Sequence, residues 1–383
     1  MHAASPEVVA RYFDHGATSF PKPAAVARAM ARYVDEVGGT YGRAAYGQVR
    51  DASRLVYEAR AALAREMGCA DPSRIAFTLN ATHALNVAIQ GLAKPGGVAL
   101  VSPLEHNSVM RPLTALTARE GLRVEILPAA PDGRVVPEAI RVPAGACLAV
   151  VAHQSNVNGV VQPIAAIRAA LAGVPLVVDA AQSAGEIALD VDATGADAVA
   201  VSGHKHLLGP TGTGALFVRP GLELPALLFG GTGSRSDSFE QPGAMPDALE
   251  PGTPNVAGLA GLGAALEFLA AHGRGDGPRL ALRAIAALEA LPGVRVLKAA
   301  RPEDQGGLFS FAVDGVPASE IARRLYERHG LAVRAGLHCA PAAHRTLGTL
   351  ANGGAIRIAF GRFHDDDAVS RVADAVADVV RRP

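Results

Sequence analysis

The sequence predicts an α/β protein with a large domain built on a mainly parallel central sheet and a smaller α+β domain at the C-terminal end. Short apolar runs typical of buried strands alternate with longer Ala/Leu/Arg-rich stretches typical of helices. Beyond about residue 255, long helices are instead mixed with isolated strands. The chain has 383 residues, more than one average domain needs, so two domains are expected.

The order of the elements supports this fold class. Five apolar runs are predicted strands of the large sheet: 98–102, 148–153, 175–180, 196–202 and 214–219. A helical stretch at 163–172 lies between the second and third runs, which predicts a β–α–β crossover. In the second part, helices are predicted over 256–272, 279–291, 319–328 and 367–382, and strands over 294–298 and 308–313. His153, Asp179 and Ser202 end three of the runs, where parallel sheets bind their ligands.

Composition and charge exclude several classes of protein. Lys plus Arg and Asp plus Glu are 36 each, so no net charge favours nucleic acid or an anionic membrane. The sequence has no apolar run of transmembrane length and no N-terminal secretory pattern. Its three cysteines are too few and too scattered for a disulfide framework or a zinc site. We therefore expect a cytoplasmic protein without metal, nucleic-acid partner or membrane partner.

The segment "VSGHKHLLGPTGTGALFV" contains Lys205, one of only four lysines in a chain that otherwise uses arginine. A lysine can lie on the surface, pair with a carboxylate, bind phosphate or act as a covalent catalyst. A Walker-type phosphate loop does not fit, because here the lysine precedes the glycines and a strand follows. Burial makes an amine nucleophilic, whereas arginine stays charged and cannot form an imine. Lys205 is therefore a candidate covalent catalyst.

Four further motifs place polar residues around this lysine. In "LVVDAAQSAG", Asp179 could hold a protonated ring nitrogen with Gln182 nearby, or it could cap a helix. In "FTLNATHALN", Thr82 falls in the first turn of a helix, where hydroxyl and free N–H groups form an anion site. His106 in "EHNSVMRP" could lie over an aromatic ring, and Asn156 follows another strand. One ligand would use all these groups: pyridoxal 5′-phosphate (PLP).

The motifs occur together and in order, from "YFDHGATSFPKP" through "SGHKHLLGPTGTG" and "LEPGTPN" to "VRAGLHCAP" and "IRIAFGRF". In this the chain resembles the fold-type I PLP enzymes of the class V aminotransferase family, and within it the group II cysteine desulfurase and selenocysteine lyase branch. The resemblance implies a PLP-binding large domain over 16–252 and a small domain formed by 1–15 and 253–383. It also implies a homodimer.

The resemblance implies a role for each candidate residue. Lys205 would carry the cofactor, with Asp179 on the pyridine nitrogen, Gln182 near the ring hydroxyl and His106 stacked on the ring. The phosphate would be bound by Thr82, Ser202 and His204, joined by Thr253 of a partner subunit, while Asn156 would contact cofactor or substrate. Arg357 and Arg334 would bind the amino-acid substrate, Arg357 through its carboxylate.

Cys339 differs from the other two cysteines, because "VRAGLHCAP" places it after a glycine turn. Cys69 and Cys147 lie in small apolar surroundings and are expected to be core residues. Arg334 and His338 are expected to favour the nucleophilic thiolate of Cys339. In the desulfurases that the motif resembles, this cysteine takes the sulfur of PLP-bound L-cysteine as a persulfide and alanine is released. His106, Lys205 and Cys339 are thus the predicted catalytic residues.

Other functions remain open on the same scaffold. They are a different PLP-dependent C–S lyase, a selenocysteine lyase, an epimerase, an aminotransferase and a non-enzymatic sulfur carrier. The joint presence of Lys205, Asp179, Arg357 and Cys339 argues against a non-enzymatic subunit. The sequence identifies no sulfur acceptor, although a protein acceptor fits the resemblance. Two segments depart from it or have no assigned role: "GRFHDDD" at 361–367, where relatives often carry an aromatic-Asn-Thr turn, and 230–247.

Overall fold

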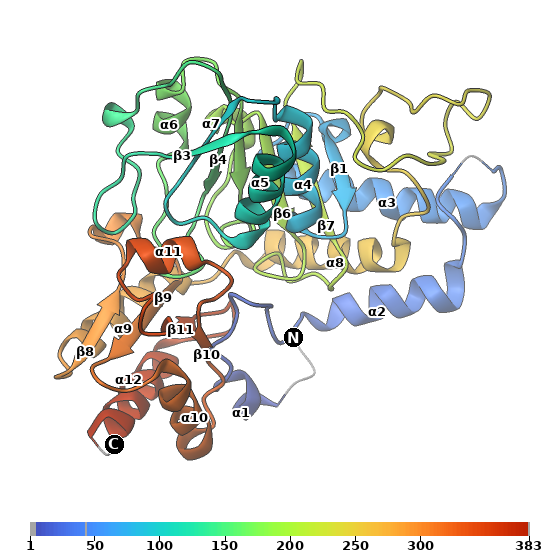
Figure 1. Ribbon diagram of the computed structural model, residues 1–383. Helices are drawn as coiled ribbons and strands as arrows, with labels where there is room; N and C mark the ends of the chain where they lie inside the picture. Colours follow the sequence, from blue (N-terminus) through green and yellow to red (C-terminus); the bar gives the residue numbers. More distant parts are fainter. Residues whose placement is uncertain (1–4, 43, 382–383) are drawn as a thin grey trace.

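A mixed seven-stranded sheet is the centre of the larger part of the molecule (Figure 1). The computed structural model describes residues 5–42 and 44–381. The strands are β1 (Ile75–Thr78), β2 (Val98–Val101), β3 (Arg123–Ile126), β4 (Ala146–Ala152), β5 (Leu176–Asp179), β6 (Ala198–Ser202) and β7 (Gly214–Val218), in the order β1-β7-β6-β5-β4-β2-β3. The neighbours from β3 to β6 are parallel, while β7 runs antiparallel to β6 and β1 antiparallel to β7. The prediction of a mainly parallel sheet is confirmed.

Helices cover both faces of this sheet. One face packs against α4 (Ala81–Leu92) and α5 (Asn107–Glu120). The other packs against α2 (Ala24–Arg32), α3 (Gly47–Glu66), α6 (Ile164–Ala170), α7 (Val191–Thr194) and α8 (Val256–His272), and a π-helical turn, Tyr33–Val37, extends α2. In β5, Leu176 and Val178 face the second group of helices while Val177 faces the first. Because both faces are covered, the central strands are apolar at nearly every position.

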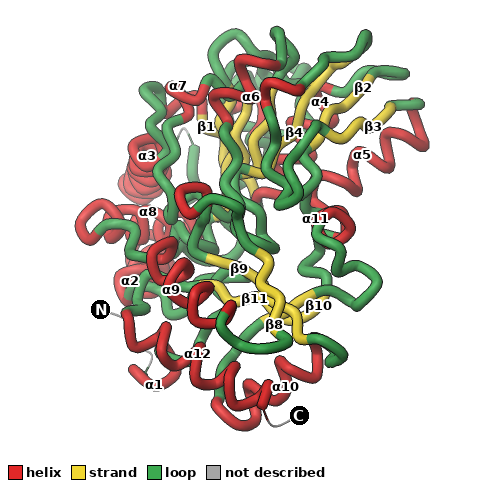
Figure 2. Tube along the Cα trace, turned by 90° about the vertical axis from the view of Figure 1, so that its left-hand side faces the viewer, coloured by secondary structure: helices red, strands yellow, loops and turns green. Residues whose placement is uncertain are grey.

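A second sheet of four antiparallel strands forms the smaller part. Its order is β10 (Arg334–Gly336), β11 (Ala355–Ala359), β9 (Leu308–Val313) and β8 (Val294–Leu297). Figure 2 shows it between the large sheet and the helices α9 (Gly277–Glu289), α10 (Ala318–His329) and α12 (Asp366–Arg381). The short helix α11 (Pro341–Thr346) follows β10 in the chain, and the short helix α1 (Pro6–Val9) precedes Tyr12 and Asp14, which form β-bridges to Ala332 and Ala359 of this part. The predicted α+β part is confirmed.

Helix α8 is apolar on nearly every face. No single helix in the described ranges is long and apolar enough to cross a membrane, and α8 with α9 meets the length and composition criteria only as a pair bent by 75°. Leu259, Leu262 and Leu266 of α8 are buried in the core on one face of the large sheet, beside α2 and α3. The predicted domain limit at 252/253 assigns α8 to the smaller domain. Its packing favours a limit after His272, and the domain limits stay a prediction.

A buried ion pair joins α3 to the chain just before Thr253. Nη1 and Nη2 of Arg60 lie 2.6 and 3.0 Å from the two carboxylate oxygens of Glu250. The backbone N–H of Phe77 in β1 donates to the same carboxylate, and neither charged side chain is more than 10% exposed. The pair therefore fixes the Glu250 end of this segment against the edge of the large sheet.

Replacing Glu250 by glutamine should lower the free energy of unfolding by about 3 kcal/mol, because it leaves the guanidinium of Arg60 buried without its counter-charge. The matched control is Glu58→Gln, since Glu58 pairs with Arg54 on the surface and is 57% exposed. Its effect should stay below about 0.5 kcal/mol. Urea unfolding followed by circular dichroism measures both variants, and equal effects would contradict the expected difference.

Candidate active site

A cavity of about 190 Å³ lies at the carboxyl ends of the parallel strands. Its walls come from the N-terminus of α4 and from the segments that follow β2, β4, β5 and β6. Eight of the predicted site residues line it together: Thr82, His106, Asn156, Asp179, Gln182, Ser202, His204 and Lys205. Gln154 and Ser108 also line it and were not among the predicted residues. Because the carboxyl ends of parallel strands meet at one edge of the sheet, side chains that are far apart in the sequence lie together here.

Lys205 lies three residues after the end of β6, in a turn that requires a glycine. A Cβ atom on Gly203 would lie 2.2 Å from Oγ1 of Thr213, so no larger residue fits there. Burial lowers the pKa of the Lys205 amine to about 8, and the negative charge of Asp179 opposes this shift. An amine with this pKa is neutral in a sizeable fraction of molecules near neutral pH, which a nucleophile or a base requires.

Asp179 is the last residue of β5 and is buried. Its Oδ1 accepts a hydrogen bond of 2.9 Å from the N–H of Ala181, within a turn and not at the start of a helix. Burial raises the pKa of this carboxyl, while that hydrogen bond, Lys205 and Ser108 lower it. Beside it, Nε2 of Gln182 donates to the carbonyl of Gly16 over 2.9 Å. The helix-cap alternative for Asp179 does not hold, and its carboxyl can face a cationic ligand group.

The wall of the cavity formed by the N-terminus of α4 and the end of β6 is suited to an anion. Thr82 lies in the first turn of α4, and the N–H of Ala81 donates to Oγ of Ser202 over 3.0 Å. β7 approaches this helix end closely, since a Cβ on Gly214 would lie 2.5 Å from Cα of Asn80. The helix N-terminus and the hydroxyl groups around it favour a bound phosphate.

Two histidines of the cavity are neutral. Burial, with smaller effects from nearby cations that include Lys205, lowers the pKa of His106 and of His204 to about 4. Nδ1 of His106 accepts from the N–H of Ser108 over 3.0 Å, so the ring carries its proton on Nε2. Nδ1 of His204 is buried and has no hydrogen-bond partner among the described residues. Neutral rings can stack on an aromatic ligand or accept from it without adding charge.

The N-terminal segment contributes contacts that sequence reasoning missed. Oδ1 of Asp14 lies 2.7 Å from Nη2 of Arg357. Nζ of Lys22 donates to the backbone carbonyl of His204 over 2.6 Å, directly before Lys205 in the chain. These pairs connect residues 343 and 182 positions apart, and neither a motif nor a period in the sequence signals them. The segment therefore contacts both parts of the molecule at the site.

Arg357 is buried in β11, and Arg334 is its register partner in β10. Nη1 of Arg357 donates to the carbonyl of Asn156 over 3.1 Å. Its Nε has no hydrogen-bond partner among the described residues. The small sheet thus places both predicted substrate-binding arginines on neighbouring strands, with Arg357 attached to a cavity loop.

Cys339 is exposed on a turn that is fastened to two cavity loops. Nδ2 of Asn156 donates to the carbonyl of His338 over 2.8 Å, and the N–H of Asn107 donates to the carbonyl of Cys339 over 2.8 Å. The φ angles of His338 and Cys339 are +50° and +55°, in the left-handed region that costs non-glycine residues about 1–2 kcal/mol each. The structure holds this thiol beside the cavity at a cost in backbone strain.

The expectation that His338 favours the thiolate is wrong. Its ring is buried and both ring nitrogens have other partners, with Nε2 3.3 Å from the carbonyl of Arg334 and Nδ1 3.4 Å from Nε2 of His344. Burial, and next the nearby charge of Arg357, lower the pKa of His338 to about 2, so it supplies no positive charge. Arg334 keeps the predicted place, because its Nη2 lies 3.8 Å from Sγ of Cys339.

Thr253 does not line the cavity of its own chain. It lies in a separate hollow of about 120 Å³, together with Leu79 and Leu228. The motif at 361–367 does not line the cavity either. His364 of this motif is buried, with Nε2 3.2 Å from the carbonyl of Val9 and its ring 4.6 Å from that of Phe13. The motif therefore fastens the N-terminal segment to the small sheet.

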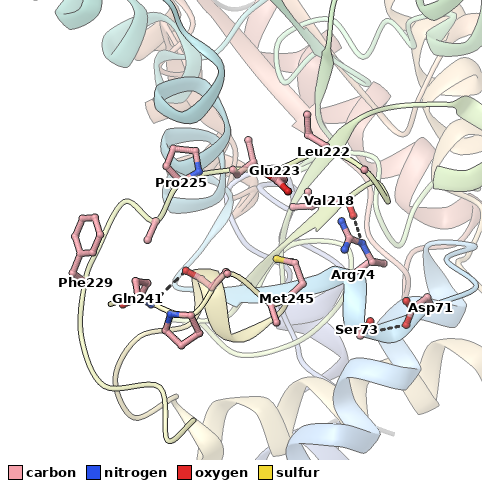
Figure 3. A pocket seen from close by; sticks show the side chains of 17 residues that line it. Asp71, Ser73, Arg74, Val218, Leu222, Glu223, Pro225, Phe229, Gln241 and Met245 are labelled. Atoms are coloured by element: carbon pink, nitrogen blue, oxygen red, sulfur yellow. Dashed lines mark hydrogen bonds between the residues drawn. The ribbon is translucent and has the colours of Figure 1, made fainter. Parts of the chain in front are cut away.

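A larger cavity, of about 890 Å³, lies between the segment 221–248 and the chain before β1 (Figure 3). Its lining includes Arg74, Phe229, Gln241 and Met245. None of the predicted catalytic residues lines it. The segment 230–247 thus forms part of a surface hollow, apart from the site that contains Lys205.

Comparisons with known proteins agree with the fold. The model of the aminotransferase class-V family matches residues 11–372. A probable cysteine desulfurase of Methanothermobacter thermautotrophicus is 33% identical over 382 residues, covering 96% of this chain and 94% of the relative. The cysteine desulfurase CsdA of Escherichia coli is 33% identical over 383 residues, covering 95% and 92%.

Solved structures give the same result. An apo cysteine desulfurase from Thermococcus onnurineus NA1 superposes with a TM-score of 0.89 and 29% identity, covering all of both chains. The S-sulfonic acid form of CsdA from Escherichia coli superposes with a TM-score of 0.85 and 29% identity, covering 99% of this chain and 96% of that one. Because the family model matches nearly the whole chain, the chain belongs to the class V aminotransferase family.

Proposed function

We propose that this protein is a PLP-dependent cysteine desulfurase, which converts L-cysteine to L-alanine and receives the sulfur on Cys339 as a persulfide. One observation carries the proposal: an exposed thiol on a strained turn is fastened to the loops of a cavity that contains Lys205 and Asp179. A lyase, an epimerase or an aminotransferase has no need of a thiol held there. The names of the relatives support the same activity.

The cavity fits PLP by the chemistry of its side chains. Oε1 of Gln182, Oδ1 of Asn156 and Nδ1 of His204 are buried polar atoms of the cavity walls that have no partner among the described residues. A ligand with a ring nitrogen, a ring hydroxyl and a phosphate supplies such partners. Lys205 would carry the cofactor, and Asp179 would hold its ring nitrogen.

The remaining walls would hold the other parts of the cofactor. His106 would stack on the ring, and Thr82, Ser202 and His204 would bind the phosphate. Ser202 accepts from the N–H of Ala81, so its own O–H is available to donate to a phosphate oxygen. When bound, PLP stabilises the negative charge that develops at the α-carbon of the substrate.

The chain's own residues would perform the other tasks. The guanidinium of Arg357 binds the substrate carboxylate, with Asp14 and the carbonyl of Asn156 fixing its orientation. Lys205 removes the proton from the α-carbon as a base. The Cys339 thiolate attacks the substrate sulfur: the S–S bond forms, the Cβ–S bond breaks, and its electron pair goes to the carbon. Protonation of that carbon, and return of the proton to the α-carbon by the Lys205 amine, yield alanine.

We also propose a cytoplasmic homodimer in which Thr253 reaches the phosphate of the partner subunit. Thr253 lies outside the cavity of its own chain, in a hollow with the exposed Leu79 and Leu228. The substrate is a small amino acid, and a protein is the acceptor of the sulfur. The balance of 36 basic and 36 acidic residues supports the absence of nucleic-acid and membrane partners.

The products formed from L-cysteine test the proposed activity. The holoenzyme with a thiol reductant should release alanine and sulfide in equal amounts. Pyruvate with ammonia would instead indicate a C–S lyase, and an amino group passed to a keto acid would indicate an aminotransferase. Racemised cysteine would indicate an epimerase, and a strong preference for selenocysteine would indicate a selenocysteine lyase. Each of these results would overturn the desulfurase proposal.

The shared site predicts that two inactive variants restore activity when mixed. Lys205→Ala and Thr253→Ala should each be impaired alone. Their heterodimer should contain one intact site, because one chain supplies Lys205 and the other Thr253. Subunit exchange followed by an alanine assay should give up to about one quarter of the wild-type activity per chain. A fully active monomer in sedimentation, or no recovery after proven exchange, would contradict the shared site.

A further inference from the structure

Three buried side chains behind the turn that presents Cys339 form a hydrogen-bond chain. Oγ1 of Thr349 lies 2.7 Å from Nδ1 of His344, and Nε2 of His344 lies 3.4 Å from Nδ1 of His338. Nε2 of His338 then lies 3.3 Å from the carbonyl of Arg334 in β10. Thr349 and His344 are fully buried and His338 is 3% exposed. This hydrogen-bond chain therefore joins the helix after the turn to the strand before it.

The donors and acceptors of this hydrogen-bond chain can be arranged in only one direction. The carbonyl of Arg334 can only accept, so His338 carries its proton on Nε2 and its Nδ1 accepts. His344 must then donate from Nε2, which leaves its Nδ1 to accept from the hydroxyl of Thr349. Both rings are neutral, since burial is the main cause that lowers the pKa of His338 to about 2 and of His344 to about 4. The hydroxyl of Thr349 is thus the first donor, and it holds the His344 ring in place by its Nδ1.

The first donor is itself held firmly. The N–H of Thr349 donates to the carbonyl of His344 over 2.9 Å, and its carbonyl accepts from Gly354 over 3.0 Å. Gly354 has φ of +103°, and a Cβ there would lie 2.1 Å from the carbonyl oxygen of Gly336. The segment after α11 is thus pressed against the end of β10, and it places the Thr349 hydroxyl against His344.

The turn needs such support because it is strained. His338 and Cys339 are consecutive non-glycine residues with φ of +50° and +55°, a conformation that persists only when its surroundings enforce it. We propose that Thr349 and His344 are positioning residues for the Cys339 thiol, acting through His338, which they hold in the one orientation that keeps the turn strained and the thiol directed to the cavity. This inference rests on the proposed desulfurase function, in which that thiol takes the sulfur.

The test removes the first donor and keeps the shape of the side chain. In Thr349→Val, kcat for alanine formation should fall at least tenfold. KM for L-cysteine and the PLP absorbance should stay unchanged, because Thr349, His344 and His338 are not among the residues proposed to bind substrate or cofactor. Thr349→Ser keeps the hydroxyl and should restore at least half of the wild-type kcat. Thr346→Val is the matched control. The hydroxyl of Thr346 donates to the carbonyls of Pro103 and Ala342, which are not part of the hydrogen-bond chain, so this variant should behave as wild type.

A second measurement separates this inference from the proposed function. Hydrogen–deuterium exchange of the holoprotein should speed up at Ala340, whose N–H donates to Leu337 within the turn, in Thr349→Val but not in Thr349→Ser. Wild-type kcat and exchange in Thr349→Val would overturn the positioning role, even where alanine is formed. If the wild-type protein forms no alanine while the two variants show this exchange pattern, only the desulfurase activity is refuted.

Should Thr349→Val not fold, His344→Leu removes the middle link and is judged by the same measurements. A kcat for His344→Leu equal to that of the wild type would then overturn the positioning role. An equal loss of kcat in Thr346→Val would do so as well, because it would show a general effect of altering this region.

Discussion

Replacing Cys339 by alanine should abolish the formation of alanine from L-cysteine and leave the bound cofactor in place. The thiol is exposed, so its loss creates no cavity in the core. The bond from Asn107 reaches the backbone carbonyl of Cys339, which alanine keeps. Loss of the only positioned sulfur acceptor removes a covalent step, and each ~1.4 kcal/mol of barrier is a factor of ten in rate. The expected loss is at least about a hundredfold.

The other two cysteines provide the control. Cys69 and Cys147 are buried in the two cores of the large sheet, and Cys69→Ala should keep wild-type turnover. After treatment of the wild-type protein with L-cysteine, mass spectrometry should find one added sulfur on the Cys339 peptide alone. A Cys339→Ala variant that turns over cysteine near the wild-type rate would remove the basis of the desulfurase proposal and favour a lyase.

Replacing Lys205 by alanine should reduce turnover at least about a thousandfold, because one side chain would be lost both as the covalent holder of the cofactor and as the base at the α-carbon. Burial, which lowers its pKa to about 8, prepares the amine for both tasks. Borohydride reduction of the wild-type holoprotein should fix PLP to the peptide that contains Lys205. Lys298→Ala is the control, since Lys298 is paired with Glu289 on the surface, and it should change neither result. An adduct on another lysine would exclude the assigned role.

In the large sheet, the strands that the sequence predicts are those buried on both faces. β5 and β6 are apolar because helices cover both of their faces, and their end residues Asp179 and Ser202 could be predicted as ligands. β3 does not stand out in the sequence, because it is an edge strand whose side chains are mostly exposed and include Arg123 and Glu125. β10 has three residues and no period to detect.

The parts of the site that the sequence does not predict depend on tertiary contacts. His338 and Cys339 are neighbours in the chain, so both were expected at the thiol, yet the turn buries one and exposes the other. The pairing of Arg357 with Asp14 is equally invisible, because it joins opposite ends of the sequence. Residue type and strand position identify the candidates, but only the folded chain decides where each side chain points.

The N-terminal segment that contacts Arg357 and the carbonyl of His204 also determines when the site can form during synthesis. Asp14 and Lys22 leave the ribosome before their partners, which follow 343 and 182 residues later. Lys22 can find its partner once the turn after β6 has been made, whereas Asp14 must wait for β11, and contacts across such long stretches of chain form slowly. A nascent chain that ends before β11 lacks Arg357, and β11 is also the strand that joins β10 to β9. The pairing of Asp14 with Arg357 can therefore form only after β11 has been made, well after the residues that line the cavity around Lys205.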